Sequence, residues 1–368
     1  MKNSIILLFL FLICACTLQA QVIDKDRYQQ RPSATTGNKA KPPTTPIRQS
    51  IPPIKKINYI GQYPKERYTN WSTELQGVTH DTGNWFFTQA EKLWKFPLTH
   101  DLNKPVGGSS PAHGIYMCTI PDHLAKRGYN HFCDLDYFDG YLFVPIEGPS
   151  LFPLLLVYKA ANLEYIGSHI IREQTGAGWC AIDPIHKGLY SSNGYIDHQK
   201  TTHRLNRYAI DFELLKQGKV VLTFIDHFYL WDESGKHHQN MKGYMQGGDF
   251  SEDGKYLYLV NGKDNKETAA RDGGIWVFDT HTHRLFTKSY STQSDFNHPN
   301  YSKTSINENF KYEYHPGRDG FLLKYEEPEG ITVGNINGYK IKGQIHVIML
   351  DNGLSFDELY FKHYEIIK

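Results

Sequence analysis

The feature that most limits what this chain can fold into is a pattern of short apolar runs that recurs five times after Ile57. Each unit has a short first segment, a turn, an aromatic or β-branched run, a loop and a further apolar run. The first segments are Gln76–Asp81, Cys133–Tyr137, Trp179–Asp183, Gln246–Phe250 and Glu329–Val333. Because such self-similarity is the signature of repeat architectures, we expect one small, separate sheet for each unit.

The composition of these runs predicts β-structure. They are rich in Tyr, Phe, Val and Ile and are separated by Gly, Asn and Asp turns, and only residues 121–128 look helical. Repeated small sheets predict an all-β protein of the β-propeller type. Five units in about 312 residues give roughly 60 residues per blade, which is long for four strands. We therefore predict five blades, with six as the alternative if residues 290–325 hide a degenerate blade.

Two phrases of the fourth unit carry a resemblance. SEDGKYLYLVN (251–261) and GGIWVFDTHTHRL (273–285) resemble the blades of a broad propeller superfamily. That superfamily includes lactonase-like, strictosidine-synthase-like and quinoprotein-like propellers. The resemblance covers most of residues 57–368 and consists of the blade pattern, which enzymes and binding modules share. It implies the propeller fold and no particular activity.

The first 20 residues predict export from the cytoplasm. Lys2 precedes an apolar run from Ile5 to Ala15, and Leu18–Ala20 provides a small-residue cleavage site, which together are typical of a bacterial signal peptide. In the alternative interpretation, Cys16 is a lipidated first residue that anchors the protein to a membrane. We expect a secreted, periplasmic or cell-surface protein. No other segment approaches the roughly 20 apolar residues that a spanning helix needs.

Residues 21–56 predict a disordered linker that precedes the propeller domain at 57–368. The linker is rich in Pro, Thr and Lys and lacks the apolar residues to fold. It carries eight Lys/Arg against two Asp, a charge of +6. Subtracting this charge and the +1 of Lys2 from the total of +1 leaves −6 for residues 57–368. A mildly acidic folded part argues against nucleic acid as a partner.

The first strand of each propeller blade lines the central channel, so its residues are the candidate site. Asp134 occupies a position at which three other units have glycine. A carboxylate there, facing Glu329 and two glutamines, predicts an oxygen-rich site for a hard cation or for sugar hydroxyls. The predicted ligand-binding residues are Gln76, Asp134, Trp179, Gln246 and Glu329. The candidate ligands of a divalent cation such as calcium are Asp134, Asp136 and Glu329.

Two histidines are candidate general bases. His131 precedes Asp134 and Asp136 closely enough to form a local cluster with them. His80 is followed by Asp81, although neighbouring residues on a strand point to opposite faces. In the alternative interpretation, Asp136 and Asp249 only close blade turns or bond backbone amides, as Asp residues commonly do.

Two functions therefore stay open. The first is a secreted or surface-tethered propeller that binds an extracellular glycan, protein or small molecule at its channel face. The second is a metal-dependent hydrolase or lactonase, with Asp134 and Glu329 holding the cation and His80 or His131 acting as base. The sequence lacks G-x-S-x-G, H-E-x-x-H, a glycine-rich phosphate loop and paired C-x-x-C motifs, which argues against common helix-bearing hydrolase folds.

Overall fold

The computed structural model describes residues 54, 56–64, 70–193, 204–237, 244–262, 274–289, 315–316, 323–324, 327–350 and 359–367. The predicted signal peptide, Cys16 and nearly all of the predicted linker lie outside the described residues. Most of 290–325, the region of the alternative sixth blade, also lies outside them. Across the described part of the chain, no helix combines the length and apolar character needed to cross a bilayer.

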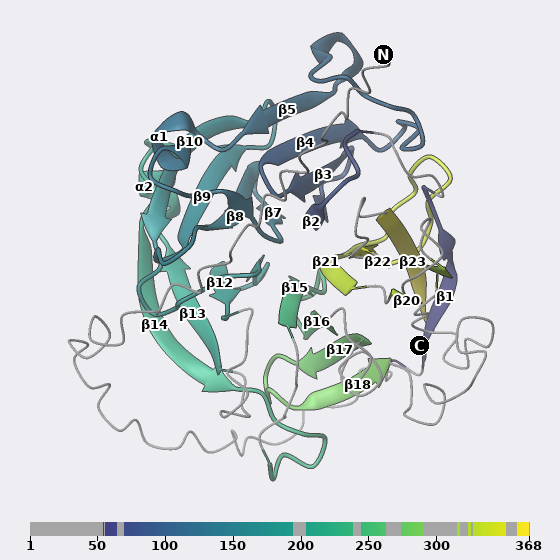
Figure 1. Ribbon diagram of the computed structural model, residues 1–368. Helices are drawn as coiled ribbons and strands as arrows, with labels where there is room; N and C mark the ends of the chain where they lie inside the picture. The colour runs from purple at the N-terminus through teal and green to yellow at the C-terminus, as the bar shows by residue number, and fades with distance from the viewer. Residues whose placement is uncertain are drawn as a thin grey trace, which may run out of the picture. The chain divides into compact units, whose positions relative to one another are not determined.

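Five antiparallel sheets surround a common centre and form the blades of a five-bladed β-propeller (Figure 1). The prediction of an all-β fold with five blades is confirmed. Blade 1 contains β2 (Leu75–His80), β3 (Asn84–Gln89), β4 (Lys92–Pro97) and β5 (Tyr116–Thr119). Blade 2 contains β6 (His131–Phe132), β7 (Asp136–Phe138), β8 (Tyr141–Glu147), β9 (Leu154–Lys159) and β10 (Glu164–Ile170).

The other three blades follow the same order from the centre outward. Blade 3 contains β11 (Cys180–Ile182), β12 (Gly188–Ser191), β13 (Arg204–Ile210) and β14 (Leu222–Tyr229). Blade 4 contains β15 (Tyr244–Phe250), β16 (Tyr256–Gly262), β17 (Gly274–Asp279) and β18 (Leu285–Ser289). Blade 5 contains β21 (Glu327–Val333), β22 (Ile345–Leu350), β23 (Leu359–Ile367) and β1 (Lys56–Gln62). The short strands β19 (His315–Pro316) and β20 (Leu323–Lys324) pair with each other.

Blade 5 is completed by the strand nearest the N-terminus. β1 pairs antiparallel with β23, with Ile57 opposite Ile366. Ile54 and Ile57 are buried in the core between blades 4 and 5. The ring of blades is thus closed by hydrogen bonds between the two ends of the domain, and this closing strand begins at Lys56, the last residue of the predicted linker.

Five hydrophobic clusters fill the five interfaces between neighbouring blades. Successive residues of one strand face opposite neighbours: Phe86 of β3 packs in the cluster shared with blade 2, and Phe87 packs in the cluster shared with blade 5. Leu155 and Leu156 of β9 alternate in the same way. Both faces of a blade are therefore buried, which explains why its strands are continuous apolar runs.

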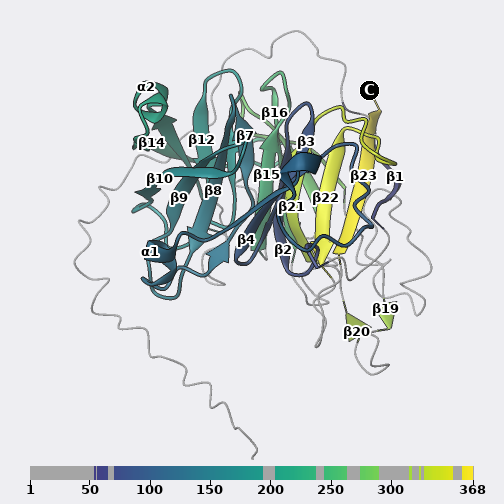
Figure 2. The same cartoon turned by 90° about the horizontal axis from the view of Figure 1, so that it is seen from above.

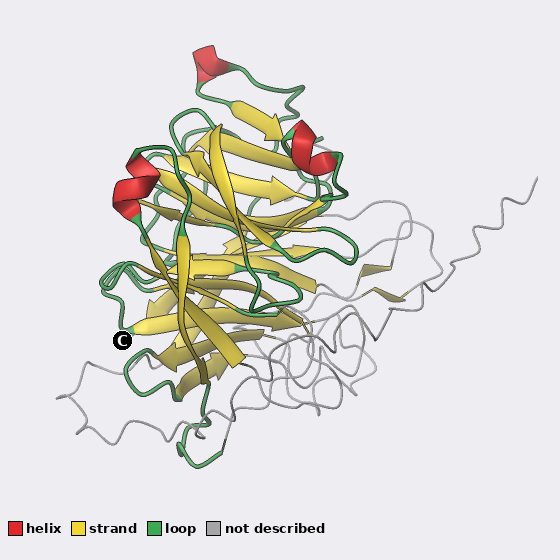
Figure 3. Cartoon of the chain, turned by 90° about the vertical axis from the view of Figure 1, so that its left-hand side faces the viewer, coloured by secondary structure: helices red, strands yellow, loops and turns green. Residues whose placement is uncertain are grey.

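The helices lie at the edges of the blades and cover no sheet (Figure 3). α1 (Asp122–Ala125) falls within the predicted helical stretch at 121–128, and α2 (Phe212–Lys216) is capped by the Asp211 side chain. The two helices lie at opposite ends of the strands (Figure 2). α1 marks the end at which the first strands β2, β7, β11, β15 and β21 begin. We call this end the channel mouth.

Candidate functional site

Asp134 lies at the centre of the propeller and contacts every other blade. Its Oδ1 accepts a hydrogen bond from the Val78 N–H of blade 1 at 3.0 Å, and its Oδ2 accepts one from the Gly248 N–H of blade 4 at 3.2 Å. The Ile331 N–H of blade 5 also bonds this carboxyl group, and the Asp134 N–H donates to the Gly178 carbonyl, which leads into blade 3, at 3.1 Å. Asp134 is fully buried.

The repeated glycines leave room for the Asp134 side chain. A Cβ at Gly77 would lie 2.5 Å from the Asp134 Cα, and one at Gly330 would lie 2.7 Å from its Oδ1. A Cβ at Gly247 would lie 2.8 Å from its Oδ2. Glycine is needed at three of the five equivalent positions because the Asp134 carboxyl group fills the space between them. The axis of the propeller is therefore closed at this level.

Two more buried carboxyl groups lie one level further along the channel. The Asp136 Oδ2 accepts a hydrogen bond from the Ile182 N–H of blade 3 at 2.6 Å. The Asp249 Oδ2 accepts one from the Val333 N–H of blade 5 at 2.6 Å and one from the Thr332 hydroxyl at 3.1 Å. Asp136 and Asp249 thus bond backbone amides of neighbouring blades and join the first strands side by side.

Burial dominates the electrostatics of these three carboxyl groups. Desolvation raises the pKa of Asp136 to about 7, against the backbone N–H donors of Ile182 and Tyr137, which lower it. Desolvation also raises the pKa of Asp249 well above its usual range, and the negative charge of Asp136 adds to this. Desolvation likewise raises the pKa of Asp134 well above its usual range.

The structure adds no support to the cation site predicted from Asp134, Asp136 and Glu329. Among the described residues, no group of three His, Cys, Asp or Glu side chains could hold a metal ion. Both oxygens of Asp134 face backbone N–H donors, whose positive ends occupy the directions from which a cation would bind. Asp136 is bonded in the same manner, one level deeper than Asp134. The carboxyl oxygens of Asp134 and Asp136 are thus engaged by backbone donors, and a calcium ion held by these two residues and Glu329 stays a prediction.

The channel mouth carries three equivalent β-bulges. The strand register shifts between Leu75 and Gly77, between Met245 and Gly247, and between Pro328 and Gly330. The extra residue of each bulge is polar: Gln76 in blade 1, Gln246 in blade 4 and Glu329 in blade 5. A bulge leaves its extra residue unpaired and redirects its side chain. Three of the five predicted ligand-binding residues are therefore the extra residues of β-bulges at one end of the channel.

The bulge residues differ in exposure and in their hydrogen bonds. Gln76 and Gln246 are partly exposed, whereas Glu329 is buried. The Gln246 Nε2 donates to the Glu327 Oε1 at 3.3 Å, and the Gln76 Nε2 donates to the Glu74 carbonyl at 3.4 Å. The mouth thus carries two partly exposed amide groups, each with a hydrogen bond, beside the buried carboxyl group of Glu329.

Blade 2 contributes His131, Cys133 and Glu147 to the same end. His131 lies opposite Glu147 in the pairing of β6 with β8. Burial lowers the pKa of His131, and Glu147 opposes this change. Burial raises the pKa of the Cys133 thiol well above its usual range, with Glu147 and Glu329 adding to it. Because the thiol is held protonated, Cys133 is a poor nucleophile.

Trp179 directly precedes β11 at the mouth end, but its side chain does not face the mouth, and His80 lies at the other end of the channel. Trp179 is fully buried in the core between blades 3 and 4, and its Nε1 donates to the Ser192 hydroxyl at 2.9 Å. His80 is at the opposite end of its strand, with Nδ1 2.7 Å from the Thr332 hydroxyl, and burial lowers its pKa to about 4. The two candidate bases, His80 and His131, are therefore not parts of one site.

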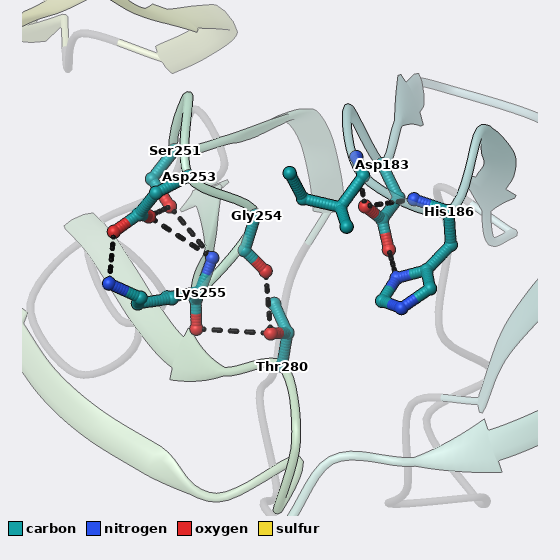
Figure 4. Close-up of polar contacts among 8 residues, drawn as sticks. Asp183, His186, Ser251, Asp253, Gly254, Lys255 and Thr280 are labelled. Carbon is teal, nitrogen blue, oxygen red and sulfur yellow. Dashed lines mark hydrogen bonds and ion pairs between the residues drawn. The ribbon is translucent and has the colours of Figure 1, made fainter.

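The motif behind the family resemblance builds a turn. Figure 4 shows that the Ser251 hydroxyl and the Asp253 carboxylate accept the Lys255 N–H, while the Thr280 hydroxyl donates to the Gly254 carbonyl. In blade 3 the equivalent turn is held by Asp183, whose carboxylate contacts the His186 ring at 2.8 Å (Figure 4). The SEDGK sequence thus specifies blade geometry and provides no ligand site.

Sequence reasoning missed Glu147 and Glu327 as residues of the mouth. Glu147 ends β8, and its carboxylate accepts the Ala177 N–H at the start of blade 3. Glu327 begins β21, is buried, and accepts the Gln246 amide. The signal available in the sequence was a glutamate at the mouth end of an apolar strand, where a buried apolar position would be expected.

Fold and site together define a five-bladed β-propeller with an axial carboxyl group and a polar mouth. No protein-family model matches the sequence, and a search of curated proteins finds no significant match.

Among solved structures, hydrazine synthase of Kuenenia stuttgartiensis is 11% identical, with a TM-score of 0.38 over 79% of this chain and 80% of that one. A Trichoderma reesei protein of carbohydrate-active enzyme family AA12 is 12% identical, with a TM-score of 0.37 over 78% and 80%. A 6-phosphogluconolactonase-like protein of Bacteroides fragilis is 15% identical, with a TM-score of 0.32 over 64% and 59%. These identities and TM-scores are too low to indicate a shared family or activity.

Proposed function

We propose that this protein is a ligand-binding β-propeller that acts outside the cytoplasm and binds a polar extracellular ligand, a glycan or a protein segment, at its channel mouth. The observation that carries the proposal is the set of three equivalent bulges that place Gln76, Gln246 and Glu329 at one end of the channel. Bulges are over-represented at rims and next to binding sites, where they redirect side chains.

The chemistry of the mouth suits hydrogen bonding to hydroxyl or amino groups. Gln76 and Gln246 provide amide donors and acceptors, and Glu327 and Glu329 provide carboxylate acceptors. Asp134 closes the axis below them, so a ligand at the mouth would rest on a floor and would not pass through the channel.

A hydrolase is the weaker candidate because the structure does not bring the predicted cation ligands and a predicted general base together in one site. Two of the three carboxyl groups proposed to hold a cation, Asp134 and Asp136, already accept backbone N–H groups. The candidate bases His80 and His131 belong to opposite ends of the channel. No observation on the described residues favours catalysis over binding.

The extracytoplasmic part of the proposal rests on the sequence of residues 1–20. With the signal removed, the Pro-rich segment 21–56 would act as a spacer. If Cys16 carries lipid, the spacer would hold the propeller away from a membrane.

The proposal is tested by a glycan-array and peptide-array screen of the protein lacking residues 1–20, followed by calorimetry on each hit. Gln76→Ala combined with Gln246→Ala removes two sets of hydrogen bonds, each contributing roughly 0.5–1.5 kcal/mol. We expect affinity to fall about tenfold or more. The matched control is Gln217→Ala, an exposed glutamine beside α2. A folded double variant that binds every hit like the unmodified protein would refute the mouth as the site.

A further inference from the structure

The connection between the first two strands is longer in blade 5 than in any other blade. β21 ends at Val333 and β22 begins at Ile345, so the connecting loop covers residues 334–344. The equivalent connections are residues 81–83 in blade 1, 139–140 in blade 2, 183–187 in blade 3 and 251–255 in blade 4. This loop follows the end of the first strand, so it lies at the end of the channel opposite to the mouth. Long loops on a rigid scaffold often carry function.

The loop is fixed to the body of the protein on one side. Ile336 and Ile341 are buried in the core cluster that also contains Trp85 of blade 1. The Tyr339 N–H donates to the Leu98 carbonyl of blade 1 at 2.7 Å. These contacts hold the loop in one conformation, so the residues between the anchors have defined positions.

The residues between the anchors are polar and exposed. Asn335, Asn337, Tyr339, Lys340 and Lys342 are all exposed, in alternation with the buried anchors. Lys340 has a positive φ of 57°, a left-handed conformation that a non-glycine residue adopts at a cost of roughly 1–3 kcal/mol. The surrounding contacts must therefore determine the backbone at this lysine, and strain of this kind clusters at binding sites.

A pocket of about 1140 Å³ lies between this loop and the outer strands β1 and β23. This volume is slightly above the range of roughly 300–1,000 Å³ typical of sites that bind small molecules. The loop contributes amides and cations to the walls, including Asn335, Asn337, Lys340 and Lys342, and β1 contributes the aromatic ring of Tyr59. Tyr63, which follows β1, is also part of the lining and is buried.

The two lysines are available to an anion. The Lys340 ammonium group lies 5.5 Å from the centre of the Tyr63 ring and 5.2 Å from that of Tyr339, a cation–π arrangement that orients it. Neither Lys340 nor Lys342 forms an ion pair with any described residue.

The nearby acids are already bonded. The Glu365 carboxylate accepts the Asn58 amide at 2.8 Å, and the Asp101 carboxylate accepts the Tyr63 hydroxyl and the Asn103 N–H. These carboxylates keep their charge, so the two lysines and Glu365 give the pocket lining a net charge of +1, although residues 57–368 carry a net charge of −6.

We propose that this pocket is a second binding site and that it takes an acidic oligosaccharide. Lys340 and Lys342 would bind its carboxylate or sulfate groups, and the Asn335 and Asn337 amides would bind its ring hydroxyls. Amide pairs suit neighbouring hydroxyls because each amide both donates and accepts. The partly exposed Tyr59 at the wall suits the apolar face of a sugar ring. The site is distinct from the mouth, since the two lie at opposite ends of the channel.

Calorimetry on the protein lacking residues 1–20 tests the proposal, with four defined probes. These are tetragalacturonic acid, a heparin tetrasaccharide, cellotetraose and tetraglutamate. We expect one or both acidic saccharides to bind, and cellotetraose and tetraglutamate to bind at least tenfold more weakly. Binding of the galacturonate alone would assign the anion as a carboxylate, and binding of the heparin fragment alone would assign it as a sulfate.

Substitutions in the pocket test whether the acidic saccharide binds there. Lys340→Gln with Lys342→Gln should reduce affinity for the acidic saccharide about tenfold or more, and Asn335→Ala with Asn337→Ala should reduce it as well. The matched control is Lys216→Gln with Lys219→Gln, which removes the same charge beside α2.

Three results would overturn the proposal: neither acidic saccharide binds, tetraglutamate binds as tightly as they do, or the control loses as much affinity as the pocket variant. Gln76→Ala with Gln246→Ala should leave this binding unchanged, so failure of the mouth proposal and failure of this one are distinguishable.

Discussion

Replacing Asp134 by alanine should destabilise the whole propeller, because one side chain links its blades at the axis. In the intact protein, the Asp134 carboxyl group accepts N–H groups of Val78, Gly248 and Ile331, which belong to three different blades. Asp134→Ala leaves these three buried donors without an acceptor.

The magnitude follows from two opposing contributions. Each buried donor left unsatisfied costs about 1–3 kcal/mol, so three donors give about 3–9 kcal/mol. Removing the carboxyl group also removes the cost of burying it, the same desolvation that raises its pKa. A water molecule in the vacated space would bond some of the donors. We therefore expect the free energy of unfolding to fall by about 3–5 kcal/mol.

Urea unfolding followed by tryptophan fluorescence measures this loss. Asp122→Ala, at the exposed start of α1, is the control and should cost well under 1 kcal/mol. Asp134→Asn keeps the volume but turns an NH₂ group towards one of the donors, so it should still be clearly destabilising. A loss for Asp134→Ala no larger than for the control would refute the view that this carboxyl group holds the blades together.

Three further predictions concern packing, pH and closure. Gly77→Ala should destabilise strongly, because its Cβ would lie 2.5 Å from the Asp134 backbone, whereas Gly107→Ala, with no atom within 4 Å, should be neutral in the same urea assay. Burial lowers the pKa of His80 and His363 to about 4, so the unfolded chain binds protons near pH 6.5 while the folded one does not. Each histidine should therefore remove up to about 3 kcal/mol of stability as pH falls from 6.5 to 4, and His363→Gln should flatten this part of a pH–stability curve. A curve with the same slope for that variant would contradict the assignment. Deleting residues 1–62 removes β1 and exposes the edge of β23, so size-exclusion chromatography should show aggregated or unfolded protein; a monodisperse, folded fragment would contradict closure by β1.

The raised pKa values of the axial carboxyl groups act in the opposite direction to those of the histidines. The pKa of Asp136 is about 7 in the folded protein and near 4 in the unfolded chain. The folded state therefore holds a proton that the unfolded state has lost, and stability falls as pH rises from about 4 to 7. For this reason the histidine prediction compares a variant with the unmodified protein and does not depend on the absolute curve.

Much of the fold could be predicted because the relevant information is local. The periodic apolar runs and their turns identified five blades, since strand formation and turn chemistry depend on neighbouring residues. The positions of Gln76, Gln246 and Glu329 at one end of the channel also followed from aligning the units. The export signal, the linker and the possibility of lipid at Cys16 stay predictions, because they lie outside the described residues.

What only the tertiary structure decided depends on residues far apart in the chain. Strand β1 could not be assigned to blade 5 from sequence, because its partner β23 lies some 300 residues away. The role of Asp134 depends on backbone N–H donors from three other blades. Every residue except proline has such a donor, so the sequence does not show which of them lie near Asp134. Trp179 and His80 were placed on the correct strands, but which neighbour each side chain faces depends on how the blades pack. Sequence by itself thus determined the repeated unit, and long-range packing decided what lies between the units, because a local pattern records whether a residue is buried and not what it is buried against.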